Sequence, residues 1–234
     1  MKLKLVKKVD EAAGTKSFYF ESDKPIKYLP GQFFYITLPK LTQEEKTGPT
    51  RMFTASSSPT EKLLRFTTRM RDTSGFKHSL DGYSIGEMVE VEGPSGTFVI
   101  DKNEKGPHVY IAGGIGVTPA ISIIQYISDK NLDTSIHLIY SNRKKEDIAF
   151  KKDLDKLAGK NIKVTYTLTE ENDPNWKGET GRVDEKMIQK LVPETKLQNY
   201  WISGPSKMVT TIQDVLTKMG VPLKQIHTEG FSGY

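Results

Sequence analysis

The pattern of apolar residues changes near residue 106, and this change constrains the fold more than any other feature of the sequence. Before it, short segments rich in β-branched and aromatic residues are separated by turns at glycine and proline. This spacing is typical of an antiparallel β-barrel or sandwich. The expected strands are residues 3–9, 17–21, 33–38, 63–70 and 88–92. We therefore predict that the N-terminal part of the chain is built from strands.

After residue 106, strands and helices alternate along the chain. The expected strands are residues 109–112, 136–140, 162–168 and 200–203, and the expected helices are residues 119–128, 147–158, 184–191 and 206–219. This alternation indicates a parallel sheet with helices on both faces. A polar stretch that ends in Gly106-Pro107 separates the two patterns. We therefore predict two domains, a β-barrel over residues 1–102 and an α/β domain over residues 106–234.

Composition excludes several classes of protein. The 234 residues include no cysteine, which excludes disulfides, zinc–thiolate sites and iron–sulfur clusters held by cysteine. The N-terminus is too charged for a signal peptide, and the most apolar stretch, residues 109–127, is interrupted by glycines and a proline. The net charge of +5 comes from scattered lysines, which favours a solvated surface or an acidic partner over nucleic-acid binding. We expect a cytoplasmic protein without a metal site or a membrane span.

A glycine-rich loop, residues 113–119, lies between an expected strand and an expected helix. Glycines there let the backbone approach a pyrophosphate, and the helix start supplies free N–H groups and the positive end of the helix dipole. Thr118 adds a hydroxyl group, whereas Pro119 stands where G-x-G-x-x-G has its last glycine. Two interpretations remain, a pyrophosphate site or a tight turn without a ligand.

The second expected parallel strand is followed by Ser141 and Arg143. In dinucleotide-binding folds this position reaches the adenosine ribose, and an acidic residue there favours a free 2′-hydroxyl group. Ser141 and Arg143 instead suit a 2′-phosphate, which favours NADPH. The alternative is that Arg143 begins a solvated helix, and the residues favour neither interpretation over the other.

A second candidate for anion binding lies in the strand-rich half. Arg51 offers two parallel donors to a phosphate. Phe53 can stack on an aromatic ring, and Thr54 can hydrogen-bond a ring nitrogen. Residues 75–79 resemble a helix start, which would be a second cradle for phosphate. The alternative is that Arg51 forms a surface ion pair and Phe53 serves packing.

Taken together, the motifs resemble those of the ferredoxin–NADP⁺ reductase superfamily over nearly the whole chain, in the family's order. Six segments carry the resemblance: Arg51-Met52-Phe53-Thr54, Gly75-Phe76-Lys77-His78-Ser79, Gly93-Pro94-Ser95-Gly96-Thr97-Phe98, the loop 113–119, Ser203-Gly204-Pro205-Ser206-Lys207-Met208, and Glu229-Gly230-Phe231. The family forms of the first and fifth are Arg-x-Tyr-Ser/Thr and Cys-Gly-Pro-x-x-Met. The chain is identified as a stand-alone member without an iron–sulfur domain.

The resemblance implies that the barrel binds FAD, that the α/β domain binds NADPH or NADH, and that the nicotinamide meets the flavin between them. It implies that Arg51 binds the flavin pyrophosphate, Phe53 lies against the isoalloxazine and Thr54 contacts its N5 edge. The other implied flavin contacts are Met52, Thr68, Arg69, Gly75, Phe76, Lys77 and Ser79. The implied nucleotide contacts are Gly114, Gly116, Val117, Thr118, Pro119, Ser141, Arg143, Gly204, Pro205 and Met208.

Two positions depart from the family pattern, and the C-terminal segment leaves one choice open. Phe53 replaces the more frequent tyrosine, and Ser203 replaces cysteine near the hydride path, so we expect slower or retuned transfer. Together with Thr54, Ser203 and Glu229 are the catalytic candidates. Glu229 either relays a proton or orients the nicotinamide, or it forms a C-terminal salt bridge. Phe231 or Tyr234 would cover the flavin, and its distance from Glu229 favours Phe231.

The sequence therefore predicts a flavoprotein oxidoreductase in which NAD(P)H reduces FAD and electrons pass to a separate acceptor. Ferredoxin, flavodoxin, a haem protein and a ferric chelate are all compatible acceptors. Two other classes remain: an electron-relay or regulatory subunit of a larger redox complex, and a phosphate-binding module without redox chemistry. The choice between FAD and FMN, the preferred nucleotide and the oligomeric state stay open.

Overall fold

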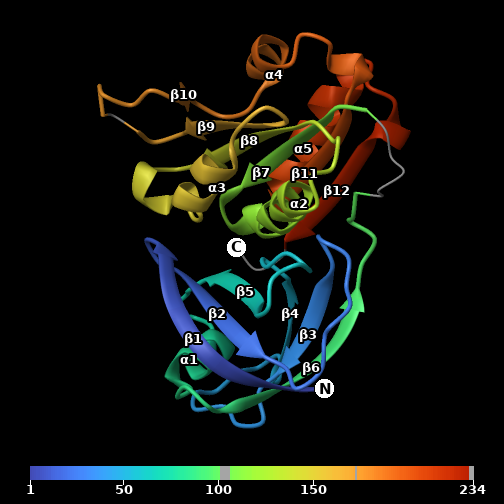
Figure 1. The fold of residues 1–234 in the computed structure, drawn as a ribbon. Coiled ribbons are helices and arrows are strands. Elements are labelled where there is room, and N and C mark those ends of the chain that lie inside the picture. Colours follow the sequence, from blue (N-terminus) through green and yellow to red (C-terminus); the bar gives the residue numbers. More distant parts are fainter. Residues whose placement is uncertain (101–105, 172, 232–234) are drawn as a thin grey trace.

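The computed structural model describes residues 1–100, 106–171 and 173–231, and within them the chain forms two six-stranded sheets (Figure 1). The first sheet belongs to the N-terminal half and the second to the C-terminal half. In Figure 1 the parallel sheet with its helices lies above the strand-rich half. The boundary predicted from the sequence falls at residues 101–105, outside the described residues.

The N-terminal sheet is antiparallel, as predicted, with the strand order β4-β3-β6-β1-β2-β5. Its strands are β1 (Lys2–Ala12), β2 (Thr15–Glu21), β3 (Phe33–Thr37), β4 (Thr50–Thr54), β5 (Leu64–Arg69) and β6 (Met88–Ser95), and helix α1 (Gly75–Gly82) follows β5. A bridge between Ala55 and Phe66 brings the edge strands β4 and β5 together. The sheet therefore curls into the predicted barrel.

Alternation along these strands sends every second side chain into the barrel. Phe66 of β5 lies at the centre of an aromatic cluster there and contacts Phe20, Phe34 and Phe53, with ring centroids 5.9, 5.8 and 6.3 Å away. Phe20, Phe34 and Phe66 are almost completely buried. This cluster holds β4 against the rest of the barrel through Phe53.

The C-terminal sheet is parallel, with the strand order β10-β9-β8-β7-β11-β12. Its strands are β7 (His108–Gly113), β8 (Ile136–Asn142), β9 (Ile162–Leu168), β10 (Glu179–Thr180), β11 (Asn199–Pro205) and β12 (Ile226–Phe231). Helices α2 (Val117–Asp129) and α3 (Lys151–Leu157) cover one face, and α4 (Glu185–Leu191) and α5 (Ser206–Lys218) cover the other. This arrangement confirms the predicted α/β fold.

The structure departs from the prediction where a helix was expected over residues 147–158. A 3₁₀ turn spans Lys145–Asp147, and α3 begins only at Lys151. Between them Phe150 has a φ of 58°, a left-handed conformation that a bulky residue rarely adopts. The apolar pattern therefore continues through a segment whose backbone is not helical throughout. Strands β10 and β12 were not expected, because β10 has two residues and β12 mixes polar and apolar ones.

Helix α2 joins the two halves, because it is buried on the side facing the parallel sheet and on the side facing the barrel. Nine of its thirteen residues are buried, and in Figure 1 the helix lies at the border of the domains. Gly31 of the barrel also packs closely here, since a Cβ at this position would lie 2.2 Å from the carbonyl oxygen of Phe98. None of the helices in the described part of the chain is long and apolar enough to cross a membrane.

The aromatic cluster predicts a large cost for removing its central ring. Replacing Phe66 with alanine should lower the free energy of unfolding by about 3–5 kcal/mol, because the substitution deletes a buried ring and leaves a cavity. Urea titration followed by circular dichroism measures this change. The matched control is Leu29→Ala, whose side chain is 54% exposed and which should cost less than about 1 kcal/mol. Equal effects of the two substitutions would contradict this account of the barrel core.

Candidate functional site

A cavity of about 580 Å³ lies at the border of the two domains. This volume is within the range of sites for small molecules and cofactors. Its barrel wall consists of Tyr35, Glu45, Thr47, Thr50, Arg51, Met52, Phe53, Thr54, Thr67, Thr68, Arg71, Thr73, Ser74 and Lys77, and the α/β domain adds Ile115, Thr118 and Phe231. Two regions that the sequence singled out, around Arg51 and around Thr118, therefore meet at one site.

Strand β4 provides the longest wall of the cavity. Arg51 and Phe53 point to one face of the strand and Met52 and Thr54 to the other, yet all four line the cavity. The cavity therefore runs along the edge of β4, which within the sheet is hydrogen-bonded to β3 alone. Backbone N–H and C=O groups on such an edge remain available to a ligand. This edge suits a planar ring with donors and acceptors along its rim.

A carboxylate already occupies the position that favours an anion. Oε2 of Glu45 accepts a hydrogen bond from the backbone N–H of Phe76, 3.1 Å away at the start of α1, and pairs with Nη2 of Arg51 at 2.9 Å. The Phe76 hydrogen bond is the main reason that the pKa of Glu45 falls to about 2. The helix start and Arg51 thus form an anion site.

Three cations line the cavity near this anion site: Arg51, Arg71 and Lys77. The Lys77 Nζ donates to the carbonyl oxygen of Arg69 at 2.8 Å. Burial, followed by the charges of Arg71 and Arg51, lowers the pKa of Lys77 to about 8. Mutual repulsion among cations at partly buried positions is relieved when a negatively charged group binds between them.

Several residues predicted to contact the flavin do not present side chains to the cavity. Phe76 is fully buried in the barrel core, so only its backbone is available. The buried Ser79 hydroxyl accepts hydrogen bonds from the N–H groups of Thr42 and Gln43. Both therefore hold the surrounding loop in place.

Gly75, Arg69 and Thr68 have different environments. A Cβ at Gly75 would lie 2.2 Å from the carbonyl oxygen of Glu44, so glycine lets the β3–β4 loop pass over α1. Arg69 pairs through Nη2 with Asp147 at 3.4 Å and does not line the cavity, whereas Thr68 does.

The nucleotide loop consists of a 3₁₀ turn, Gly114–Gly116, followed by α2. Gly114 has a φ of 52°, and its α-carbon faces open space, where a ligand can approach. Gly116 serves packing, since a Cβ there would lie 2.3 Å from the carbonyl oxygen of Ser203. No side chain caps α2, but the N–H of Val117 bonds to the carbonyl oxygens of Gly114 and Ile115 and Pro119 has no N–H, so this helix start offers an anion mainly the positive end of the helix dipole. Val117 and Pro119 are buried within that turn.

Several other predicted nucleotide contacts surround this loop. Gly204 has a φ of 144° and lies against the backbone of Gly113, and the sulfur of Met208 fills the space beside Gly113. Pro205 ends β11 immediately before α5. Thr118 lines the cavity, with its hydroxyl donating to the carbonyl oxygen of Ile115 at 3.1 Å.

Ser141 and Arg143 lie at the carboxyl end of β8, as predicted. The Arg143 side chain is 71% exposed and its Nε lies 3.7 Å from the Glu170 carboxylate. An acidic residue therefore stands beside the basic residue that suggested NADPH. This pairing favours neither nucleotide.

Ser203 is buried beneath the nucleotide loop and does not line the cavity. Its hydroxyl donates to the carbonyl oxygen of Gly116 at 2.5 Å and lies 2.8 Å from the Tyr110 hydroxyl. The first bond holds the loop against β11 and the second joins β11 to β7, so Ser203 supports the loop from below.

Glu229 and Phe231 lie on β12, where Glu229 is paired with Ser203 and Phe231 with Pro205 of the adjacent strand β11. Oε2 of Glu229 is buried, and no hydrogen-bond partner for it exists among the described residues. Burial raises the pKa of this carboxyl group to about 7. Phe231 lines the cavity, and Tyr234 falls outside the described residues. Among the residues that the structure describes, no group of histidine and acidic side chains is placed to hold a metal ion.

Sequence reasoning missed Glu45, Tyr35, Thr67 and Arg71 as cavity residues. Alternation along β3 offered a signal for Tyr35, because it is an exposed aromatic residue between the buried Phe34 and Ile36. Glu45 and Arg71 lie in loops, where no periodicity indicates which way a side chain points.

Two family models match the chain. The oxidoreductase FAD-binding domain matches residues 2–100, and the oxidoreductase NAD-binding domain matches residues 110–214. These matches coincide with the barrel and the α/β domain. They assign FAD to the first and a nicotinamide dinucleotide to the second.

Several known proteins are similar to this chain over nearly its whole length. Flavohemoprotein A of Dictyostelium discoideum is 26% identical over 239 residues, which cover 96% of this chain and 58% of the relative. The glycine betaine monooxygenase reductase subunit of Chromohalobacter salexigens is 25% identical, covering 98% of this chain and 63% of the relative. The chain thus spans about three fifths of the length of these curated relatives. A crystal structure of a ferredoxin NADP⁺ reductase from Neisseria gonorrhoeae with bound FAD and NADP has the same fold, with a TM-score of 0.84 at 16% identity and 98% coverage of both chains.

The raised pKa of Glu229 predicts a pH-dependent stability. The folded protein keeps the proton of Glu229 up to a pH of about 7, whereas the unfolded chain loses it near the ordinary value of 4.5. The unfolding free energy should therefore fall as the pH rises between these values, by up to ~3 kcal/mol. Urea unfolding at about pH 5 and about pH 8 measures this change. Glu229→Gln has no proton to lose and should show a smaller fall; identical falls in both proteins would refute the assignment.

Proposed function

This chain belongs to the ferredoxin–NADP⁺ reductase superfamily, in which an FAD-binding barrel precedes an NAD-binding domain, and from that premise we propose that it is an NAD(P)H-dependent flavin reductase. The observation that carries the proposal is the single cavity bounded by the edge of β4 and by the start of α2. Each domain supplies one wall, so two ligands bound to the two domains would meet there.

The residues of the cavity fit FAD. The anion site formed by Arg51 and the N–H of Phe76 already holds a carboxylate, and we propose that it takes the flavin pyrophosphate. Phe53 would lie against the ring system, and Thr54 would hydrogen-bond its edge. Lys77 and Arg71 add positive charge beside the phosphates. When bound, FAD accepts a hydride, which carries two electrons and one proton, from NAD(P)H and thereby leaves NAD(P)⁺.

This chain's own residues would supply alignment. Gly114 lets the nucleotide backbone approach, and the positive end of the α2 helix dipole would face its pyrophosphate. Ser203 keeps the loop in place through Gly116. Glu229, with a pKa near neutrality, is suited to hold a proton beside the nicotinamide. Phe231 would cover the ring face that the nicotinamide must reach.

Electrons must then leave to an acceptor that this chain does not contain, since it has no cysteine for an iron–sulfur cluster. We propose a protein acceptor, either a ferredoxin, a flavodoxin or a haem protein. The name of one relative, a monooxygenase reductase subunit, supports a second candidate, in which the chain is the reductase component of a larger complex.

Anaerobic stopped-flow mixing of the FAD-loaded protein with NADH and with NADPH tests the function. We expect the yellow flavin absorbance to bleach with at least one nucleotide. A protein that does not take up FAD, or whose bound FAD is reduced by neither nucleotide, would overturn the proposal. Steady turnover with ferricyanide separates the two candidates, because an independent reductase supports it and a subunit that needs its partner does not.

The anion site yields a prediction about cofactor affinity. The phosphates of FAD must displace the Glu45 carboxylate from Arg51 and Phe76, so Glu45→Gln should tighten FAD binding by about tenfold, or about 1.4 kcal/mol. Fluorescence titration of FAD into the flavin-free protein measures the affinity. Glu44→Gln is the matched control, since it removes the same charge one residue away. Arg51→Ala should weaken binding at least about tenfold. If Glu45→Gln binds FAD no tighter than Glu44→Gln does, the carboxylate does not compete with the phosphates.

A further inference from the structure

The proposed reaction depends on how the two domains are held, because each domain supplies one wall of the cavity. One buried hydrogen bond joins the walls directly. The Ser122 hydroxyl of α2 donates to the carbonyl oxygen of Ser57, at 2.6 Å, and both side chains are fully buried. This inference rests on the proposed function for its consequence, but the contact itself is a property of the domain border.

The two serines lie close in the chain to the residues that line the cavity. Ser57 follows Thr54 by three residues, and Ser122 follows Thr118 by one helical turn. Ser57 is also held on its own side, where the Tyr28 hydroxyl donates to its carbonyl oxygen at 3.0 Å and the Arg65 N–H donates to its Oγ at 2.9 Å. Few residues therefore separate the Ser122–Ser57 hydrogen bond from β4 and from the start of α2, and Ser57 is held in place within the barrel.

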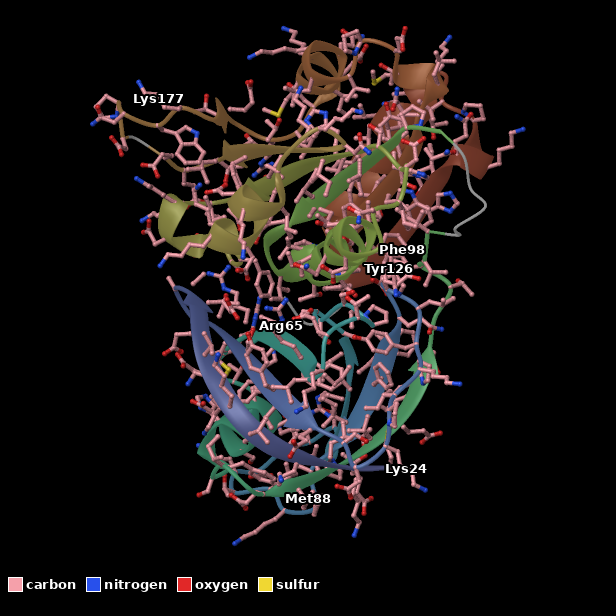
Figure 2. All side chains as sticks on the ribbon, viewed as in Figure 1. Lys24, Arg65, Met88, Phe98, Tyr126 and Lys177 are labelled. Carbon is pink, nitrogen blue, oxygen red and sulfur yellow. The ribbon has the colours of Figure 1, made fainter. Side chains whose placement is uncertain are left out.

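Arg65 of β5 makes a second contact across the border, and Figure 2 shows its side chain between the barrel and the α/β domain. Only 7% of this side chain is exposed, and Nη2 donates to the carbonyl oxygen of Ser56 at 2.7 Å. Its guanidinium carbon lies 4.7 Å from the ring centroid of Phe150. Nη1 also lies 3.8 Å from the carboxylate of Asp153 in α3. Arg65 thus connects the segment after Thr54 to the start of α3.

Phe150 has the strained, left-handed conformation described above. For a non-glycine residue this conformation costs about 1–2 kcal/mol. The ring is almost completely buried in the core beneath α3 and lies over Arg65. Packing on both sides keeps the residue in this conformation. The unusual backbone therefore coincides with the point at which the barrel touches α3.

Neither contact belongs to the walls of the cavity, and burial separates them from the other polar contacts of the border. An apolar border tolerates sliding of one surface over another, whereas a buried hydroxyl that loses its acceptor costs about 1–3 kcal/mol. Other polar contacts are Thr60–Asp129, Arg69–Asp147 and the backbone hydrogen bond from Ala13 to Glu146. Each includes an exposed or half-exposed partner, so water can replace it at lower cost, although the Asp147 side chain itself is only 13% exposed. The two buried contacts therefore specify one arrangement of the domains.

We propose that Ser122 and Arg65 are positioning residues, which form a two-point clamp that sets the orientation of the nucleotide domain over the edge of β4. A single contact leaves the domains free to rotate about it, and the second contact removes that freedom. The clamp holds α2 and the start of α3 at once, so it fixes where the nucleotide loop lies relative to Thr54. Hydride transfer is sensitive to such placement, since a misplacement of about 1 Å can cost about 100-fold in rate.

The first test measures domain orientation without reference to activity. The chain has no cysteine, so cysteines introduced as Glu90→Cys on β6 and Lys186→Cys on α4 accept spin labels at those two sites alone. Distances between the labels are recorded by pulsed electron resonance in flavin-free and FAD-loaded protein. We expect one narrow distribution for the unaltered clamp and a broadened or shifted one in Ser122→Ala. Ser128→Ala makes the same change in the same helix and should leave the distribution narrow.

The second test measures hydride transfer at saturating nucleotide by stopped flow. Ser122→Ala should slow transfer roughly 10- to 100-fold while the affinity for FAD changes less than about twofold. Arg65→Lys keeps the charge and should give an intermediate rate and an intermediate width of the distance distribution, and it carries the test if Ser122→Ala does not fold. If both variants match Ser128→Ala in distance and rate, the clamp is refuted. If unaltered protein shows no flavin reduction but the distances broaden as expected, the proposed function fails and the clamp stands.

Discussion

The burial of helix α2 against both the parallel sheet and the barrel is the contact on which the rest of the structure depends. A helix that begins at a nucleotide loop normally has one face in the solvent. Here Ser122 and Ile123 of that helix meet the barrel, where Ile123 approaches Gly31. The loop before the helix is thereby brought to the edge of β4. The cavity is a consequence of this packing, since neither domain encloses it alone.

Charge is the second organising feature of the site. Arg51, Arg71 and Lys77 line the cavity near the start of α1, and Glu45 forms an ion pair with Arg51 there. A folded chain without an anion there would leave like charges facing one another. Glu45 therefore stabilises the flavin-free protein by the same electrostatic complementarity that would bind phosphate. The Glu45 carboxylate thereby also lowers the affinity of the flavin-free protein for phosphate, which must displace it.

Most of the fold could be predicted from the sequence, because periodicity reports which residues a strand or helix buries. The strands 162–168 and 136–140 and the helix 206–219 were placed within about two residues. Prediction was wrong for the start of the helix at residue 147, because the contact of Phe150 with Arg65 overrides a local helical pattern. It also missed β4 as a strand, since Thr50–Thr54 is short and includes the charged Arg51.

The site was predictable where family motifs coincide with backbone geometry and less so where distant segments meet. The motifs located Arg51, Phe53 and Thr118, all of which line the cavity. They gave no indication that Ser79 holds the β3–β4 loop or that Glu45 reaches α1, because both depend on a loop that no period describes. The roles of these side chains toward the cofactors remain predictions.

The buried contact among Ser203, Gly116 and Tyr110 has a consequence for chemical durability. A buried thiol is inert, but whenever the nucleotide loop opened, oxidation of a thiol at this position would enlarge a side chain that has no room to grow. An alcohol makes the same supporting contact and is inert to such oxidation. With no cysteine among its 234 residues, the chain presents no thiol that oxidative stress could modify. A serine under this loop removes that route of damage.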